Sequence, residues 1–272
     1  MAIGTYNIMN SAIQIDDHNM VNLLLNMMDI VDGSTLNALL MDSSLWGSLS
    51  VIKLLVDRGA DINHTNSTHM SPLMMAAWNN NVDAYKLLVN MGAIEDPFTH
   101  TDDTPLMCAI DGSAHDMLAY LISINKDVNT KSTSFDHTLK GILRVIELND
   151  YESMRMLLDA DVDINCVYNI KNVKHTALSY AISMNRTSLV KMLVDKGANS
   201  ILGYDCGADS MVTAIKKGDL KSVGTFLDAG VDVNALYEFD GELHSALTIS
   251  IICHNIDMMN MLLSRGIDVN LP

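Results

Sequence analysis

Carboxylates, histidines and cysteines are the side chains through which this chain could perform acid–base, nucleophilic or metal chemistry. Carboxylates lie close together in sequence at Asp102-Asp103 and at Asp159, Asp161 and Asp163, and the chain has nine histidines and four cysteines. None of them shows the spacing of a zinc site, a nucleophile elbow or a glycine-rich phosphate loop. We therefore interpret these carboxylates as solvated turn residues and predict no metal, no cofactor and no enzymatic activity.

Charge and composition narrow the class of partner. The chain carries 33 acidic and 17 basic residues, a formal net charge of −16 at pH 7. This charge disfavours nucleic acid and anionic membrane and favours a partner with a basic surface, although solubility alone would also explain it. We find no 18-residue apolar run and no secretory signal, and the cysteines are far apart in sequence. We therefore expect reduced thiols and a cytoplasmic location.

One segment recurs along the chain. LLVDRGADIN, which ends at Asn63, returns as LLVNMGAIED, LISINKDVN, LLDADVDIN, LVDKGANSI, FLDAGVDVN and LLSRGIDVN, with ends 33 or 36 residues apart. In the first copy Val51, Leu54 and Leu55 form an apolar helical stripe, and Gly59 follows the last apolar turn. The pattern predicts the end of a helix and then a tight turn. We call it the closing segment.

A second segment, the opening segment, precedes each closing segment. It reads SPLMMAA, TPLMCAI, TALSYAI and SALTISI, and weaker versions begin at Ser34, His137 and Asp209. Each unit therefore predicts a turn, a first helix, a loop, a second helix and a glycine stop. A helix pair this small cannot bury its apolar face alone, so neighbouring pairs must stack into a solenoid.

A T-P-L-x-x-A opening and an L-L-x-x-G-A-D-V-N close at a period near 33 resemble the ankyrin repeat family. The resemblance implies an all-α ankyrin-repeat solenoid of helix-turn-helix units joined by short, β-hairpin-like fingers. It predicts a degenerate N-terminal repeat or cap at 1–33 and seven repeats at about 34–66, 67–99, 100–132, 133–168, 169–204, 205–237 and 238–272.

Two departures from the family pattern carry expectations. The family's histidine after T-P-L is absent, and Asn37, Met74 and Ser179 are among the residues in its place, so we expect looser fingers. Three extra residues in repeats 1 and 4 are expected to lengthen a helix or an inter-helix loop.

The resemblance implies that partners bind the concave strip formed by the fingers and first helices. Aromatic residues follow five successive closing segments, at Phe98, Phe135, Tyr168, Tyr204, Tyr237 and Phe239. Exposed rings are favoured as interface anchors, whereas rings that pack on the next finger would seal the stack. Both interpretations remain open.

Acidic residues and a tryptophan point to the same strip. The acids are concentrated in the second and sixth fingers, which include Asp102, Asp103, Glu238, Asp240 and Glu242. Trp78 on a first helix is the best single anchor candidate, with core packing as the alternative. We predict a binding module that captures a partner protein with a basic surface.

Two other functions remain open. One is an inhibitor that acts as an acidic decoy of a nucleic-acid-binding or host-defence protein, because the composition resembles stand-alone viral ankyrin proteins; the location would then be the host cytoplasm. The other is a self-assembling solenoid that associates through its C-terminal repeat, where Ile251 and Ile252 add apolar surface.

The family also implies a modification of its turns. Asparagines of the closing segment can be substrates of asparaginyl hydroxylase, and the matching residues are Asn63, Asn129, Asn165, Asn234 and Asn270. Hydrogen bonding within the turn is the plainer role.

Overall fold

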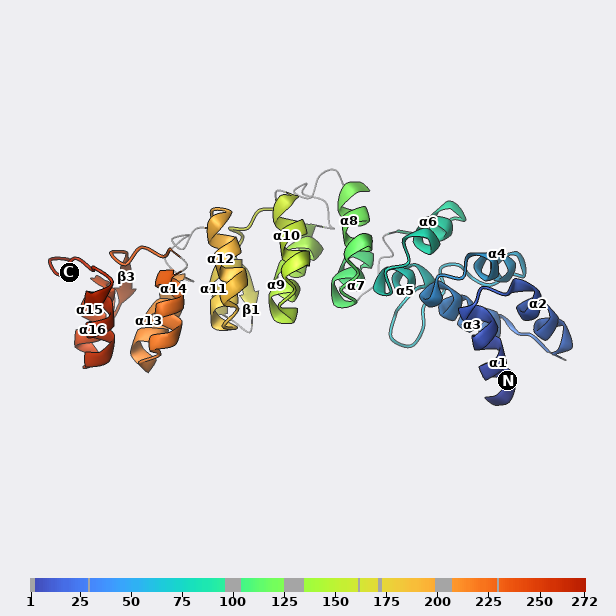
Figure 1. Ribbon diagram of the computed structural model, residues 1–272, viewed down its shortest axis with the longest axis horizontal. Helices are drawn as coiled ribbons and strands as arrows, with labels where there is room; N and C mark the ends of the chain where they lie inside the picture. The colour runs from blue at the N-terminus through green and yellow to red at the C-terminus, as the bar shows by residue number, and fades with distance from the viewer. Residues whose placement is uncertain are drawn as a thin grey trace. The chain divides into compact units, whose positions relative to one another are not determined.

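The computed structural model describes residues 3–28, 30–95, 104–124, 135–160, 162–170, 173–198, 207–228 and 230–272. Over these ranges the chain forms sixteen helices and two β-hairpins, and it divides into two compact units, Met1–Gly141 and Ile142–Pro272. The predicted all-α, helix-turn-helix class is confirmed (Figure 1).

Helix pairs stack in the first unit. Its helices are α1 (Ile3–Gln14), α2 (His18–Met27), α3 (Gly33–Trp46), α4 (Leu49–Asp57), α5 (Pro72–Trp78), α6 (Val82–Asn90), α7 (Pro105–Asp111) and α8 (His115–Ile124). The first helices α1, α3, α5 and α7 pack in series, and the second helices α2, α4, α6 and α8 do the same. Each pair thereby covers the apolar face of the preceding pair.

The second unit, which begins within α9, repeats this arrangement and adds the hairpins. Its elements are α9 (Phe135–Leu148), α10 (Tyr151–Asp159), β1 (Tyr168–Ile170), β2 (Val173–His175), α11 (Ala177–Ser183), α12 (Thr187–Asp195), α13 (Gly207–Lys217), α14 (Leu220–Asp228), β3 (Leu236–Phe239), β4 (Glu242–Ser245), α15 (Ala246–Ile252) and α16 (Ile256–Ser264). The first helices α11, α13 and α15 pack in series, and α10 packs on α12 and α14 on α16.

The opening segments start helices because their first residue caps the N-terminus. The side chains of Ser71, Thr104, Thr176 and Ser245 each accept a hydrogen bond from the amide three residues later. This bond satisfies one of the donors that a helix start leaves without a partner. Proline at the first position of α5 and α7 adds to the signal, since its missing N–H is not needed there.

One residue with positive φ lies in the loop of each described helix pair: Asp16, Gly47, Asn80, Ser113, Asn149, Asn185, Gly218 or His254. This backbone region favours glycine and tolerates Asn and Asp, which accounts for the small polar residues at the loop. A second reversal follows α4, where Gly59 has a φ of +94°. The predicted glycine stop is confirmed at this position.

The two hairpins of the described residues lie in fingers of equal length. Thr176 follows Asn165 by eleven positions, and the finger between them forms the antiparallel pair β1–β2, with Tyr168 opposite His175. Asn234 and Ser245 are equally far apart and enclose the pair β3–β4.

The second hairpin closes through a two-residue turn, because Phe239 pairs with Glu242. The turn residues Asp240 and Gly241 have φ values of 53° and 88°. A type I′ turn requires positive φ at both positions, and the sequence Asp-Gly is favoured there.

The extra residues of repeats 1 and 4 lengthen the first helix, since α3 and α9 have 14 residues whereas α5, α7, α11 and α15 have seven. The prediction that Phe135 lies in a finger is wrong, because Phe135 is the first residue of α9. The proposed repeat limits 168/169 and 237/238 fall inside β1 and β3. The division into a cap and seven repeats stays a prediction.

Candidate functional site

The structure buries the finger aromatics whose side chains it describes. Tyr168 in β1 is 8% exposed and Tyr237 in β3 is 6% exposed, and Phe239 is equally buried. Burial favours the packing interpretation for these three rings over the interpretation as open anchors. Phe98, Tyr204 and the side chain of Phe135 lie outside the described residues, so their predicted role is not tested.

The buried rings are held by their own unit. Lys216 Nζ lies 4.7 Å from the centroid of the Phe239 ring, and the His244 ring meets Phe239 edge-on with centroids 6.2 Å apart. Burial raises the pKa of both Tyr168 and Tyr237, and neither hydroxyl has a hydrogen-bond partner among the described residues. Both phenols therefore stay neutral. The strand β3, which carries Tyr237 and Phe239, packs on the first helices α13 and α15.

The acids of the sixth finger remain available to solvent. Glu238, Asp240 and Glu242 are exposed around the β3–β4 turn, and Glu242 Oε2 lies 3.9 Å from His244 Nε2. Asp102 and Asp103 of the second finger lie outside the described residues.

Trp78 is exposed, as the anchor prediction requires, and the second tryptophan of the chain, Trp46, is also exposed. Trp78 is 43% exposed at the end of α5, and Trp46, at the end of α3, is 46% exposed. Trp46 is not among the residues predicted from the sequence, although the chain has only two tryptophans and Trp46 follows the weak opening segment that begins at Ser34.

The closing asparagines link successive repeats. Asn63 Oδ1 accepts a hydrogen bond from the Ile94 amide at 2.9 Å, and Asn234 Oδ1 accepts one from the Asp268 amide at 2.8 Å. These bonds reach the following repeat, so the asparagines do more than close their own turn. Asn165 and Asn270 are tied to Asp163 and Asp268 within their turns, and Asn129 lies outside the described residues. Hydroxylation of these side chains stays a prediction.

Asn37 makes a related bond from a first helix. Its Oδ1 accepts a hydrogen bond from the Asp61 amide at 2.8 Å, and it stands where the family has histidine. At this position the finger is therefore tied to the first helix by a side chain other than the usual one, which argues against a looser finger there.

A polar cluster on α9 and α11 is structural in character. Tyr180 Oη donates to Glu147 Oε1 at 2.7 Å, and Arg144 Nη1 donates to Glu147 Oε2 at 2.9 Å. Burial alone would raise the pKa of Glu147, but these hydrogen bonds lower it below its usual value. Burial and the bond to Glu147 raise the pKa of Tyr180 to about 12. Glu147 is thus ionised and Tyr180 neutral at pH 7, which is unsuited to proton transfer between them.

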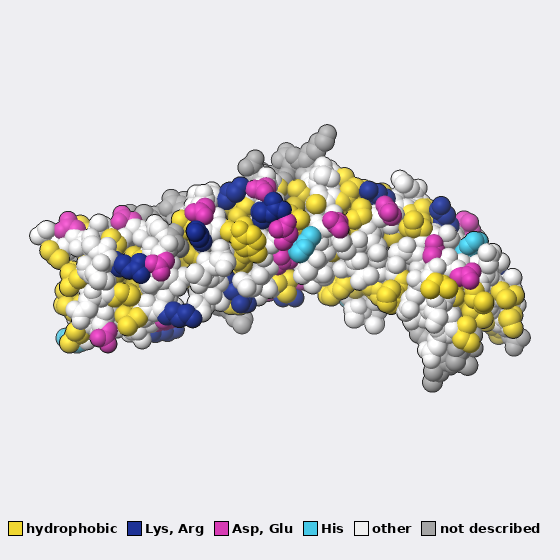
Figure 2. All heavy atoms as spheres, in the orientation of Figure 1, with side chains coloured by type: hydrophobic (Ala, Val, Ile, Leu, Met, Phe, Trp, Pro, Cys, Tyr) yellow, Lys and Arg dark blue, Asp and Glu magenta, His cyan; other side chains and the backbone are white. Residues whose placement is uncertain are grey.

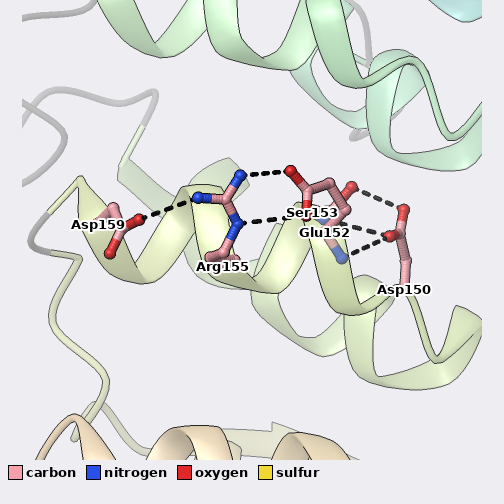
Figure 3. Close-up of polar contacts among 5 residues, drawn as sticks. All are labelled: Asp150, Glu152, Ser153, Arg155 and Asp159. Carbon is pink, nitrogen blue, oxygen red and sulfur yellow. Dashed lines mark hydrogen bonds and ion pairs between the residues drawn. The ribbon is translucent and has the colours of Figure 1, made fainter.

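In the second unit, basic side chains on and beside the second helices form ion pairs with acidic side chains of these helices. Figure 3 shows Arg155 between Glu152 and Asp159 along α10, with its Nη1 3.8 Å from Asp159 Oδ2. Lys196, which directly follows α12, reaches the same Asp159 with its Nζ at 2.7 Å. Basic and acidic side chains accordingly interleave over α10 and α12 in Figure 2. This face is close to neutral and offers little net charge to a partner.

The C-terminal pair exposes apolar side chains. Ile251, Ile252, Ile256 and Leu263 are exposed, whereas Met258 is fully buried. Figure 2 shows hydrophobic side chains at the surface over α15 and α16. Ile182, at the place in α11 that Ile251 occupies in α15, is buried in its own stack.

Reactive groups are scarce in the described part of the chain. No three His, Cys, Asp or Glu side chains come together there as metal ligands, and no described helix is long and apolar enough to cross a membrane. Burial raises the pKa of Cys166 to about 11, and a hydrogen bond to Asp163 contributes to this rise to a smaller extent. This thiol is therefore protonated at pH 7 and a poor nucleophile.

Comparisons with known proteins agree with this geometry. A sequence profile described as "Ankyrin repeats (3 copies)" matches residues 40–132 and 142–237. Among ankyrin repeat proteins of fowlpox virus (strain NVSL), FPV115 is 27% identical over 230 residues, which cover 73% of this chain and 40% of that protein. FPV240 is 26% identical over 131 residues, which cover 48% and 30%. The chain thus spans less than half the length of these relatives.

A solved structure shows the same fold. The crystal structure of the human ASB11 ankyrin repeat domain matches with a TM-score of 0.59 and 22% sequence identity. The match covers 84% of this chain and 97% of that domain.

Proposed function

Because the chain belongs to the ankyrin repeat family, whose repeats in general bind other proteins, we propose that it captures a partner protein with a basic surface. The binding side is formed by the first helices and the fingers. The proposal is for a binding module without catalytic activity, acting in the cytoplasm.

The proposal rests on the different charge of the first-helix side and the second-helix side in residues 1–124. This stretch holds fourteen carboxylates and only three cations, Lys53, Arg58 and Lys86. Lys53 and Lys86 lie in α4 and α6, and Arg58 directly follows α4. No lysine or arginine occurs in α1, α3, α5 or α7, nor in the segments 59–71 and 92–104 between helix pairs. The first-helix side therefore carries only negative formal charge.

Contacts keep two of these cations on the second-helix side. Arg58 Nη2 donates to the side-chain oxygens of Asn22 and Asn26 in α2. Lys86 Nζ lies 4.7 Å from the centroid of the Tyr120 ring in α8. Neither cation is therefore held where it would neutralise the first-helix side. A surface of one sign attracts a partner of the opposite sign and speeds the encounter.

The acidic-decoy alternative is a special case of this binding. The net charge of −16 and the fowlpox relatives favour it, since a viral protein that presents acid could occupy the nucleic-acid site of a host protein. Competition decides between the two: a nucleic acid displaces the chain from a decoy target and leaves an ordinary partner bound.

The self-assembly alternative rests on the apolar side chains of α15 and α16. Sedimentation over a range of concentrations tests it. A single species at all concentrations would exclude it, whereas growth of larger species that Ile252→Asp abolishes would support it.

The proposal is tested by capture from a cell lysate with two matched variants. Asp102→Asn/Asp103→Asn removes two of the four carboxylates of the second finger, and Asp57→Asn/Asp83→Asn removes two exposed carboxylates of the second helices. Both variants change the net charge equally. We expect a protein with a basic surface to be captured by the parent chain and by the second variant, and more weakly by the first, with weaker capture at high salt. Equal capture by both variants, or salt-independent capture, would contradict the proposal.

A further inference from the structure

The first helix pair exposes apolar side chains at positions that later pairs bury. The loop residue with positive φ, which is Asp16 in the first pair, places equivalent residues of different pairs in register. Four positions after it, α4, α6, α8, α12 and α16 carry buried apolar residues: Val51, Ala84, Met117, Leu189 and Met258. The equivalent residue of α2 is Met20, and it is 41% exposed. The outer side of α2 is therefore a stacking face that stays open among the residues that the structure describes.

This open face extends over both helices of the first pair. Ile8 of α1 is exposed, whereas the equivalent residues of α3, α5, α7, α11 and α15 are buried: Leu39, Pro72, Pro105, Ala177 and Ala246. Leu23 and Met27 of α2 are exposed as well, at helical spacing from Met20. Figure 2 shows hydrophobic side chains at the surface over α2. We call Ile8, Met20, Leu23 and Met27 the N-terminal face.

The last helix pair exposes a different set of positions. Three positions before the loop residue, α5, α7, α11 and α13 carry buried residues: Ala77, Ile110, Ile182 and Ile215. The equivalent residue of α15 is Ile251, and it is 48% exposed. Met259 of α16 is half-buried, whereas the equivalent residues of α4, α6, α8 and α12 are buried: Ile52, Tyr85, Leu118 and Val190. Leu263, one turn after Met259, is exposed, and we call Ile251, Met259 and Leu263 the C-terminal face.

The two faces are opposite sides of a repeat. In the first pair, the positions equivalent to the C-terminal face hold Ile13 and Val21, which are fully buried. In the last pair, the positions equivalent to the N-terminal face hold Ala246 and Met258, which are also buried. Each end pair thus buries the side that meets its neighbour and exposes the other side. Within the chain the two kinds of side pack against each other, as α2 does on α4 and α14 on α16.

We propose that the N-terminal face of one copy of this chain binds the C-terminal face of a second copy. The contact continues the stacking interface that runs through the chain, with α16 of one copy in the place that a preceding second helix would hold against α2. Such a heterologous contact leaves one face unused on each outer molecule, so assemblies grow beyond dimers. The inference does not depend on capture of a basic partner. It rests on the self-assembly alternative and names the second face that this alternative needs.

Charge favours these two faces for a contact between copies. Each copy carries a formal net charge of −16, so that two copies repel each other. The helices α1, α2 and α15 contain no Asp, Glu, Lys or Arg, and α16 contains only Asp257. A contact between the end faces therefore buries apolar side chains and leaves the carboxylates of the fingers in water. A partner with a basic surface would find few carboxylates to pair with on these helices.

Two variants block one face each. Met20→Glu places a carboxylate on the N-terminal face, and Ile251→Glu places one on the C-terminal face. Both side chains are exposed in the single chain, so neither change enters a packed core, and far-UV circular dichroism verifies the fold. Ile94→Glu adds the same charge at an exposed residue after α6 and is the matched control. If a blocked variant fails to fold, Met27→Glu or Leu263→Glu replaces it.

Sedimentation equilibrium over a range of concentrations measures the association. We expect the average mass of the parent chain and of Ile94→Glu to rise with concentration, and to rise more at high salt, because salt screens the repulsion between copies. Each blocked variant alone should associate at least about tenfold more weakly, since the contact would bury a carboxylate without a partner. An equimolar mixture of the two blocked variants should form a dimer and stop there, because each keeps the face that the other lacks.

The opposite results would overturn the inference. A parent chain that stays monomeric at all concentrations would do so, as would a mixture no larger than its components. Association of Met20→Glu alone at the strength of the parent would indicate a contact between two C-terminal faces, and the same result for Ile251→Glu would indicate one between two N-terminal faces. Either would overturn the head-to-tail contact and leave self-assembly standing.

Capture from lysate separates this inference from the proposed function. A basic partner captured by a monomeric parent chain would overturn this inference alone. Association of the parent chain without capture of a basic partner would overturn the proposed function alone, and failure of both assays would overturn both proposals.

Discussion

Gly112→Ala should destabilise the first unit, although local preference favours alanine. Gly112 has φ −82° and ψ −2°, which any residue adopts, so the backbone opposes no side chain there. The new Cβ would lie 1.9 Å from Trp78 O, about 1 Å inside the 3.0 Å limit that real Cβ contacts keep. The Cβ would clash with backbone atoms of Trp78 in α5, so no side-chain rotation relieves the contact.

The magnitude follows from two opposing terms. Overpacking of this kind destabilises the folded state by about 1–3 kcal/mol. Replacing glycine by alanine in a compatible conformation stabilises it by about 0.4–1 kcal/mol, because the unfolded chain loses conformational entropy. We expect a net loss of about 1–2 kcal/mol, which corresponds to roughly 2–8 °C in Tm for a unit of this size.

Urea denaturation followed by tryptophan fluorescence measures this loss, since both tryptophans lie in the first unit. Gly224→Ala is the matched control: it lies inside α14, and its Cβ would meet no atom within 4 Å. We expect this change to stabilise the second unit by about 0.5–1 kcal/mol, measured by circular dichroism. A Gly112→Ala chain as stable as the parent would refute the close approach of α5 and α7.

Three further changes test other contacts. Asn63→Ala should lower the unfolding free energy by about 1 kcal/mol, because the Ile94 amide loses its partner. Asn270→Ala, which loses only the exposed bond from its Nδ2 to Asp268 Oδ1 within the same turn, should cost less, and denaturant midpoints compare the two variants. Burial lowers the pKa of His175 in the folded chain. Its contribution to stability is therefore present above the unfolded pKa near 6.5 and is lost as pH falls through the folded pKa. His175→Gln should flatten this pH dependence, which denaturant midpoints measured from pH 7 down to 5 would show. Gly241→Ala should cost about 1 kcal/mol from backbone strain alone, since φ is +88° and its Cβ would be unhindered, and thermal denaturation would show it.

The sequence predicted the repeating elements well because their signals are local. An N-cap such as Ser71, a proline at the next position and the glycine after α4 each act on the backbone within a few residues. The same signals recur at each unit, so the pattern was readable without any long-range contact. The place of the inserted residues could not be predicted, because a three-residue insertion satisfies the period whether it enters a helix or an inter-helix loop. Phe135 is predicted as a finger residue because it follows Asn129 by six positions, and in the structure it begins α9.

Exposure was the property that the sequence could not provide. Tyr168 and Tyr237 follow their closing segments at the same distance, as an exposed ladder would, yet the hairpins turn both rings inward. Trp46 and Trp78 stay open because they end helices whose apolar faces are already covered by neighbours. The sequence by itself determined that the chain is a series of helix pairs of the ankyrin type, acidic overall. Only the tertiary structure decided which aromatic side chains are available to a partner, because that depends on how successive repeats cover one another.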